Sequence, residues 1–189
     1  MEEKSKAIAV LFAMKDSIYK TFGECDVYDI DRNALTFKGG LPVIAHPPCR
    51  LWGRLAHLSS APKGEKELAI WAVDQVRKNG GILEHPSSTR LWKEANLPQV
   101  GKIDSFGGWT LVVLQYWFGH RAEKKTRLYI VGVYPKDVPQ IPLRLGRPEF
   151  TISSSKKKDK SPEVSSKERS ATPKEFAIWL IEVAKKCKA

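Results

Sequence analysis

The sequence predicts an α/β fold, in which a doubly wound, mostly parallel sheet carries an antiparallel hairpin at one edge. Short, continuous apolar runs such as residues 7–12 are typical of strands that are buried on both faces of a parallel sheet. An amphipathic helical segment, residues 62–79, separates two such runs, and strand–helix–strand order makes the flanking strands parallel. Two later segments, residues 111–117 and 128–133, are strand-like and joined by a polar turn, which predicts the hairpin. The chain of 189 residues is long enough to form one domain over its whole length.

The first elements are two strands joined by a short helix. Residues 7–12 are the first expected strand, and residues 16 and 17 offer an N-cap for a helix over residues 18–22. Residues 25–29 are interpreted as the second strand, which ends at Asp29. In nucleotide-binding α/β folds an acid at this point accepts hydrogen bonds from ribose hydroxyls, although strand ends also often carry a solvated aspartate.

The third strand, residues 43–45, leads into a loop with a cysteine. His46 and two prolines follow the strand, and proline cannot donate to a sheet ladder, so the strand must end here. Cys49 is therefore expected on a stiff loop at a strand's end, where open α/β sheets keep their reactive groups. The alternative interpretation is that Cys49 packs under a turn as a small hydrophobic residue.

A second reactive side chain is expected beside Cys49. After the helix of residues 62–79, residues 82–83 form a short buried strand that runs into Glu84. Because the strands are parallel, Cys49 and Glu84 should lie on the same carboxyl edge of the sheet. The alternative for Glu84 is an N-cap or an ion pair for the next helix.

The last third of the chain changes in composition. Residues 87–94 are expected to be helical, and the hairpin follows. A basic Pro/Ser/Lys-rich insert covers residues 135–170, and its part from Ser153 to Lys167 is interpreted as a mobile loop. Such a loop suits either a phosphate backbone or a solvated linker. A final helix is expected with Thr172 as N-cap and Pro173 at its first position.

Charge and cysteine content limit the classes of function. The formal net charge is +11, which suits a polyanionic partner such as nucleic acid, although a merely soluble basic protein remains an alternative. Three cysteines, Cys25, Cys49 and Cys187, do not resemble a disulfide framework, and no Cys/His spacing predicts a metal site. No apolar run approaches the roughly 20 residues of a membrane span, and the charged N-terminus has no signal-peptide layout. We therefore expect a reducing, cytoplasmic setting and no membrane association.

Five stretches of the chain resemble the motifs of one family. Residues 47–49 are Pro-Pro-Cys, and residues 84–86, about 35 positions further on, begin with glutamate. Residues 123–127 read Glu-Lys-Lys-Thr-Arg before an apolar strand, and residues 169–177 read Arg-Ser-Ala-Thr-Pro-Lys-Glu-Phe-Ala. Residues 28–34 read Tyr-Asp-Ile-Asp-Arg-Asn-Ala. In order and spacing these stretches resemble the Pro-Pro-Cys, Glu-Asn-Val, Gln-x-Arg-x-Arg, Arg-x-x-Thr-Pro and Glu-x-Asp-x-x-Ala motifs of the DNA cytosine-C5 methyltransferases.

The resemblance implies a Rossmann-like, class I methyltransferase fold and modification of cytosine at C5. Cys49, on the loop with Pro48, would be the nucleophile that adds to C6 of the ring. Glu84 would hold the N3 edge and keep N3 protonated, a role that a raised carboxyl pKa would suit. Arg127 would hold the base's O2 or a phosphate, and Arg50 and Arg127 would provide the cationic surroundings that a thiolate needs.

The resemblance also implies a cofactor and a nucleic-acid surface. The cofactor is S-adenosylmethionine, although Met14 and Asp16 stand where the family has the two glycines of its cofactor loop. The implied cofactor-binding residues are Phe12, Asp29, Asp31 and Pro47. The residues expected to contact DNA or a pyrimidine nucleotide are Arg50, Arg54, Lys125, Lys156, Lys157 and Lys158. The insert of residues 135–170 takes the place of a target-recognition domain and is too small for a core of its own, so recognition of a duplex sequence needs a protein partner.

Two classes of function therefore stay open. One is an enzyme that acts at pyrimidine C5, on DNA or on a free nucleotide, with S-adenosylmethionine or another one-carbon donor. The other is a catalytically altered or inactive relative that binds nucleic acid or a protein. The compact form resembles proteins of bacteriophages and prophages, which implies a DNA-modification role in the cytoplasm of a bacterial host.

Overall fold

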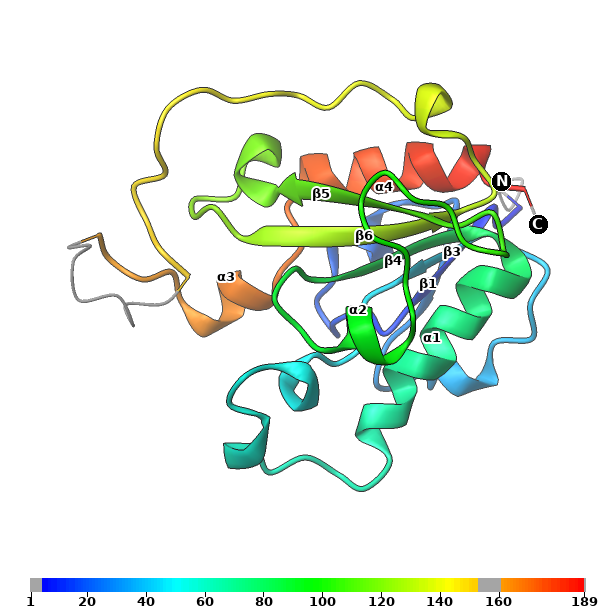
Figure 1. Ribbon diagram of the computed structural model, residues 1–189, viewed down its shortest axis with the longest axis horizontal. Helices are drawn as coiled ribbons and strands as arrows, with labels where there is room; N and C mark the ends of the chain where they lie inside the picture. Colours follow the sequence, from blue (N-terminus) through cyan, green and yellow to red (C-terminus); the bar gives the residue numbers. More distant parts are fainter. Residues whose placement is uncertain (1–4, 153–160, 189) are drawn as a thin grey trace.

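The fold is built on one six-stranded mixed sheet (Figure 1). The computed structural model describes residues 5–152 and 161–188. The strands are β1 (Ile8–Leu11), β2 (Cys25–Tyr28), β3 (Val43–Ala45), β4 (Gly81–Pro86), β5 (Trp109–Leu114) and β6 (Lys125–Val131). Their order is β2-β1-β3-β4-β6-β5; the first four are parallel, and β6 is antiparallel to both β4 and β5. This confirms a mostly parallel sheet with an antiparallel hairpin at one edge.

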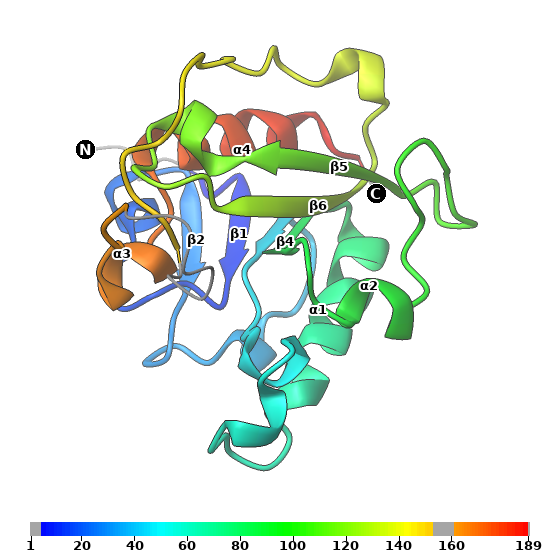
Figure 2. The ribbon, with the colours of Figure 1, turned by 60° about the vertical axis from the view of Figure 1, so that its left-hand side comes forward.

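Helices cover both faces of the sheet (Figure 2). They are α1 (Glu65–Asn79), α2 (Leu91–Glu94), α3 (Ser166–Ser170) and α4 (Lys174–Lys186). Because successive strand residues point to opposite faces, Val10 packs in the core beneath α4 with Leu180, whereas Leu11 packs in the core beneath α1 with Val73. The apolar run of β1 is therefore explained by burial on both sides, and the α/β arrangement expected from the sequence is confirmed at this level.

Strand β4 is longer than expected, and this places Glu84 inside the sheet. The last parallel rung between β3 and β4 joins Ala45 to Leu83. The antiparallel neighbour β6 continues the pairing, with Glu84 opposite Leu128 and Pro86 opposite Thr126. The prediction of a strand over residues 82–83 alone was wrong because β4 is held on its other side by β6.

The hairpin is also shifted from its predicted position. β5 ends at Leu114, and a 3₁₀ helix, Gln115–Phe118, follows and ends at Gly119, whose φ of +92° lies in the left-handed region that favours glycine. β6 begins at Lys125, three positions earlier than predicted. The residues at its start are polar, and they alternate between exposure at Lys125 and burial at Thr126. A polar strand of this kind has no apolar run for sequence analysis to detect.

Two helices are shorter than predicted. α1 begins at Glu65 rather than at residue 62, because Gly64 has a φ of +86° and interrupts the helix there. The helix expected over residues 87–94 is reduced to α2, because a turn in which the Thr89 N–H donates to the Pro86 carbonyl (3.3 Å) precedes it.

The predicted N-caps have different outcomes. Ser17 accepts a hydrogen bond from the Tyr19 N–H, and it caps a 3₁₀ helix, Ile18–Thr21. In α4, however, Pro173 itself is the N-cap residue, and no side chain caps the helix. The prediction of Thr172 as N-cap was therefore wrong by one position.

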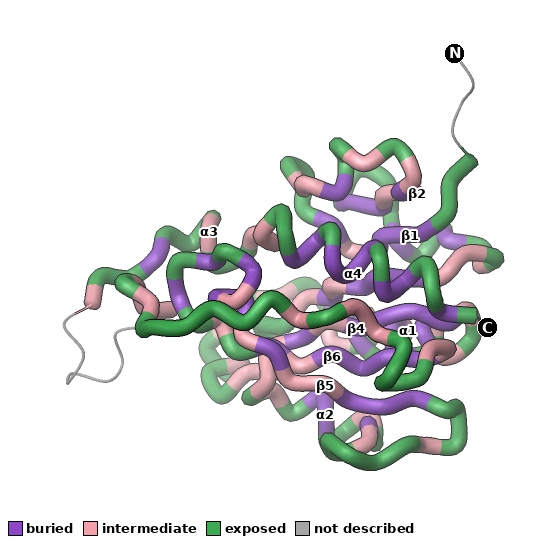
Figure 3. The backbone as a smooth tube through the Cα atoms, turned by 90° about the horizontal axis from the view of Figure 1, so that it is seen from above, coloured by how far each residue is buried: buried purple, intermediate pink, exposed green. Residues whose placement is uncertain are grey.

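The part of the insert that precedes residue 150 runs along the outside of the fold as a largely exposed segment (Figure 3). Most of residues 139–149 are exposed, but the indole N–H of Trp179 in α4 donates to the Pro139 carbonyl at 3.1 Å. Phe150 pairs with Ala122 in an isolated β-bridge, and α3 follows within the insert. Residues 153–160 of the predicted mobile loop lie outside the described residues. Residues 161–165 lead into α3, which includes the last two residues of that predicted loop. In the described parts of the chain, no helix is long and apolar enough to cross a membrane.

Candidate functional site

A pocket of about 700 Å³ opens at the carboxyl edge of the parallel strands. Its walls come from the loops after β1 and β3, from the end of β4, from the segment before β6, and from α3 and the residues that follow it. Of the site residues predicted from the sequence, the pocket brings together Phe12, Pro47, Pro48, Cys49, Glu84 and Lys125. Cys49 and Glu84 were expected to meet at one edge of the sheet, and both line the pocket that opens there.

Cys49 is an exposed residue on a loop that is firmly anchored. The N–H of Trp52 donates to the Cys49 carbonyl at 3.0 Å, and the buried Trp52 in turn accepts at its own carbonyl from the Arg90 N–H at 3.0 Å. The pocket walls still exclude enough water from the thiol to raise its pKa, and the negative charge of Glu84 adds to this effect. The thiol is therefore protonated at neutral pH and must lose its proton before it can act as a nucleophile.

The cation near Cys49 differs from the two that were predicted. Arg50 forms a two-point ion pair with the buried carboxylate of Glu65, so its guanidinium is already engaged. Lys124 instead lines the pocket, and its charge lowers the pKa of the Cys49 thiol in opposition to burial. The Lys124 ammonium is held in place by the Ala171 carbonyl at 2.8 Å.

Glu84 is surrounded by hydrogen-bond donors. Its Oε1 accepts from the Gln115 amide at 3.2 Å and from the Thr126 hydroxyl at 3.1 Å, and its Oε2 lies 3.1 Å from His46 Nδ1. Burial would raise the pKa of Glu84, but the hydrogen bond from His46 and the charges of His46 and Lys124 lower it to about 2. The expectation of a raised pKa was wrong, because the sequence did not reveal these donors.

His46 extends this network to Tyr19. The Nε2 atom of His46 lies 3.2 Å from the hydroxyl of Tyr19, whose side chain is almost completely buried. Both residues line the same pocket as Glu84. From the sequence, His46 was expected only to mark the end of a strand. Its position directly after a buried strand, three residues before Cys49, was the signal that could have identified it.

Arg127 lies on the opposite face of the sheet from Glu84. Glu84 pairs with Leu128, which belongs to the core beneath α4, so the neighbouring Arg127 points to the other face. There its guanidinium packs over the ring of Trp92 at 5.0 Å, and its buried Nε has no hydrogen-bond partner among the described residues. Arg127 is therefore not among the residues that line the pocket, and the structure does not bring it to the side of Glu84, where its predicted role at the substrate ring would place it.

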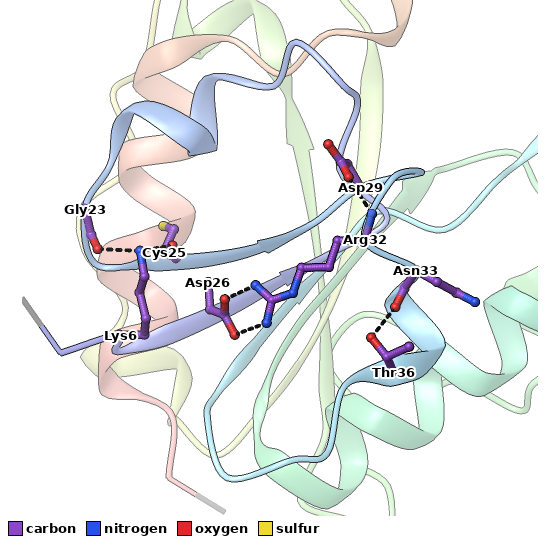
Figure 4. A network of polar contacts seen from close by, with 8 residues as sticks. All are labelled: Lys6, Gly23, Cys25, Asp26, Asp29, Arg32, Asn33 and Thr36. Atoms are coloured by element: carbon purple, nitrogen blue, oxygen red, sulfur yellow. Dashed lines mark hydrogen bonds and ion pairs between the residues drawn. The ribbon is translucent and has the colours of Figure 1, made fainter.

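The residues predicted to bind a cofactor do not fit the family's mode of binding. Asp29 is buried, and its carboxylate accepts from Lys20 and from the N–H groups of Asp31 and Arg32, as Figure 4 shows for Arg32. The hydrogen bond from Lys20 and those from the backbone lower its pKa to about 2. The Asp29 side chain is outside the residues that line the pocket, and Asp31 is exposed and paired with Lys15. A ribose would have to displace these donors from Asp29.

The loop after β1 also differs from a cofactor loop. Phe12, with a φ of +61°, packs edge-to-face on Trp71 and lines the pocket. Met14 and Asp16 line the pocket as well, so side chains occupy the space that glycines would leave free. The residues present therefore do not fit S-adenosylmethionine in the family's manner.

Basic side chains gather at the mouth of the pocket. Lys125 is exposed there, and Arg169 and Lys167 line the opposite wall, where Lys167 pairs with Asp16 at 2.6 Å. Arg54 is exposed on the loop beyond Cys49 and is not a pocket residue. The other predicted basic contacts, Lys156, Lys157 and Lys158, lie outside the described residues.

No family model, no curated protein and no solved structure matches this chain. The function is therefore argued from the pocket itself. It combines one exposed thiol, one ionised carboxylate fixed by three donors, and a basic rim.

Proposed function

We propose that this chain is an enzyme that activates a pyrimidine ring for modification at C5, with Cys49 as the nucleophile. The observation that carries the proposal is the placement of Cys49 and Glu84 on the loop after β3 and on β4, in the walls of one pocket. A thiol and a carboxylate at that edge are suited to contact one planar ring from two sides. The resemblance of both residues to their counterparts in the cytosine-C5 methyltransferases supports the same assignment.

The chemistry begins with addition of the Cys49 thiolate to C6 of the ring. As the S–C6 bond forms, the C5–C6 π bond breaks and its electrons form a C4–C5 enamine, so that C5 becomes nucleophilic and negative charge develops at N3. Lys124 supplies positive charge near the sulfur, and Glu84 holds the N3 edge of the ring. In the simplest cycle C5 takes a proton from solvent, loses the original C5 hydrogen, and expels the thiolate, which exchanges the C5 hydrogen without any other reagent.

Methyl transfer is not part of this mechanism. Asp29 is held by its own donors outside the pocket lining, and Met14 and Asp16 fill the glycine positions, so the residues present give S-adenosylmethionine no site of the family's type. The substrate that the pocket supports best is a pyrimidine with a phosphate nearby, because Lys125 and Arg169 line its mouth. In DNA such a base must be flipped out or presented in a single strand.

The test is release of tritium from C5-tritiated cytosine, measured with single-stranded DNA and with deoxycytidine monophosphate. We expect release by the wild type, none by Cys49→Ser, and a loss of about 100-fold or more in Glu84→Gln. Glu123→Gln is the matched control, because Glu123 is exposed and lies outside the pocket, and it should retain full activity. Absence of release from both substrates, or full release by Cys49→Ser, would contradict the proposal.

A second candidate function is binding without catalysis, and the raised pKa of the Cys49 thiol favours it. A protonated thiol is a poor nucleophile, whereas the basic rim would serve a binding protein equally well. Tritium release by the wild type and by Cys49→Ala separates the two functions, because a binding protein would hold single-stranded DNA equally well in both forms and release no tritium in either. An enzyme would keep its affinity but lose tritium release.

A further inference from the structure

His46 connects two buried partners at the back of the pocket. Its Nδ1 lies 3.1 Å from Glu84 Oε2, and its Nε2 lies 3.2 Å from the Tyr19 hydroxyl. The side chains of His46 and Glu84 are each only 14% exposed. This chain of three residues thus runs from the interior of the fold to the carboxylate that faces the pocket.

The hydrogen bonds around Glu84 fix where protons are held. Thr126 accepts from the Gln115 amide at 2.9 Å, so its own hydroxyl hydrogen is free to donate to Glu84 Oε1. With the Gln115 amide also donating to Oε1, the carboxylate accepts on this side, and Nδ1 of His46 must be the donor on the other. The low pKa of Glu84 agrees with this arrangement, since no proton is stored on the carboxylate itself.

Addition of the thiolate to C6 nevertheless leaves N3 in need of a proton. Tyr19 cannot supply it, because burial and the charge of Glu84 raise the pKa of its hydroxyl well above the ordinary value. Lys124 is turned to the Ala171 carbonyl, which accepts from its ammonium. His46 is the remaining group that contacts Glu84, and an imidazole can carry a proton on Nδ1 and release it to a neighbouring carboxylate.

We propose that His46 is a positioning residue that also stores the proton for ring N3, and that it delivers this proton through Glu84. This inference rests on the proposed function. As Cys49 adds to C6, the imidazolium Nδ1–H bond breaks and its proton passes to Glu84 Oε2. The carboxylic O–H then turns toward the ring and its proton passes to N3. His46 ends neutral, Glu84 ends ionised, and the electron pair released by addition forms the N3–H bond.

Several charged and titratable groups face the His46–Glu84 pair. Tyr19 from the 3₁₀ helix and Glu84 from β4 contact His46 directly, while Cys49 on the same loop and Lys124 before β6 face the same pocket. At the rim, Asp16 is paired with Lys167, and Lys125 and Arg169 add positive charge.

The proposal predicts a distinctive pH profile for adduct formation. The reactive form needs both a charged His46 and a Cys49 thiolate, and burial raises the pKa of the thiol above its ordinary value of 9.0. The rate should therefore rise tenfold per pH unit in acid and then level off once His46 loses its proton, because each further gain in thiolate is offset by an equal loss of imidazolium. In a variant whose side chain at position 46 cannot store a proton, the rate of adduct formation should keep rising tenfold per pH unit until the Cys49 thiol has ionised.

The test compares the wild type with His46→Asn, whose side-chain amide can still donate to Glu84 but cannot store a proton. The probe is a single-stranded oligonucleotide that carries 2-pyrimidinone, whose C6 accepts a thiolate without a second reagent, and the adduct is followed by mass spectrometry. We expect the wild-type rate to level off and the His46→Asn rate to keep rising, with a loss of about 10- to 100-fold near neutral pH. The same levelling in His46→Asn, whatever the size of its loss, would show that His46 only positions Glu84 and would overturn the inference.

A second measurement does not depend on the variant folding. The ¹⁵N chemical shifts of the histidines in the wild type report the pH at which His46 loses its proton, and this should agree with the pH at which the adduct rate levels off. A difference of more than about one pH unit would overturn the inference. If the wild type forms no adduct at any pH and releases no tritium, the proposed function itself has failed, and the inference fails with it.

Discussion

Replacing Glu84 by glutamine should remove a pH-dependent contribution to the stability of the fold. The three donors around the carboxylate hold it in its charged form, and its pKa is about 2 rather than the ordinary 4.5. Because the folded pKa is lower than the unfolded one, this stability is fully present above about pH 4.5 and is lost as the pH falls toward 2. Glutamine cannot ionise, and its NH₂ group must face at least one of the same donors.

The size of the effect follows from the pKa values. One pKa unit corresponds to 1.36 kcal/mol, so the depression of the Glu84 pKa is equivalent to about 3 kcal/mol, and about 2 kcal/mol of this should disappear between pH 4.5 and pH 3. The side chain is 14% exposed, so screening by solvent reduces this value little. The free energy of unfolding would be measured by urea denaturation of the wild type and of Glu84→Gln at several pH values from 5 to 3, where unfolded-state histidines stay charged.

The difference between the two proteins is the informative quantity, because the other carboxylates titrate in both. We expect Glu84→Gln to be less stable than the wild type at pH 5. The difference between their free energies of unfolding should shrink by about 2 kcal/mol by pH 3. Glu123→Gln, at an exposed position, should follow the wild type at every pH. A gap that changes by less than about 0.5 kcal/mol over this range would refute the idea that Glu84 is held ionised.

Two further predictions concern the thiol and the sheet. Lys124→Met should raise the pKa of the Cys49 thiol further, so the pH dependence of Cys49 alkylation by iodoacetamide should move to higher pH. Lys125→Met, the control, should change this pKa less. An unchanged or lower Cys49 pKa in Lys124→Met would contradict the charge assignment. Gly81→Ala should destabilise the protein by about 3 kcal/mol or more in urea denaturation, because its φ is +121° and a Cβ would lie 2.0 Å from the carbonyl oxygen of the facing β3 residue. Gly23→Ala, with open space and no positive φ, is the control, and equal losses in both would contradict the steric argument.

The sequence was sufficient to predict the parallel part of the sheet. β1 and β3 are runs in which every residue is buried, and burial on both faces leaves a continuous apolar pattern. The start of β6 could not be predicted in the same way, because Lys125 and Arg127 alternate with the buried Thr126 and no apolar run is formed. The strand exists there because β4 and β5 pair with it on both sides, which is a long-range effect.

The two central residues of the site were predictable for a related reason. Cys49 lies on the loop after β3, and Glu84 follows the last parallel rung of β4, and parallel order places such positions at one edge. Arg127 was misplaced because its side of the sheet depends on the register between β4 and β6, in which it pairs with His85 and not with Glu84. A shift of one residue moves a side chain to the other face, and a motif does not specify that register.

Asp29 shows how one residue type at one position can have two outcomes. At the end of β2 an aspartate can accept from a ribose or from its own surroundings, and the sequence is the same in both cases. Here the 3₁₀ helix after β1 carries Lys20 to the carboxylate, and the turn after β2 adds two backbone N–H groups. Opening this cluster for a ligand would leave the Lys20 ammonium without its ion-pair partner. A ligand of this pocket is therefore expected to be recognised from the side of Glu84 and Cys49, because both residues line the pocket and Asp29 does not.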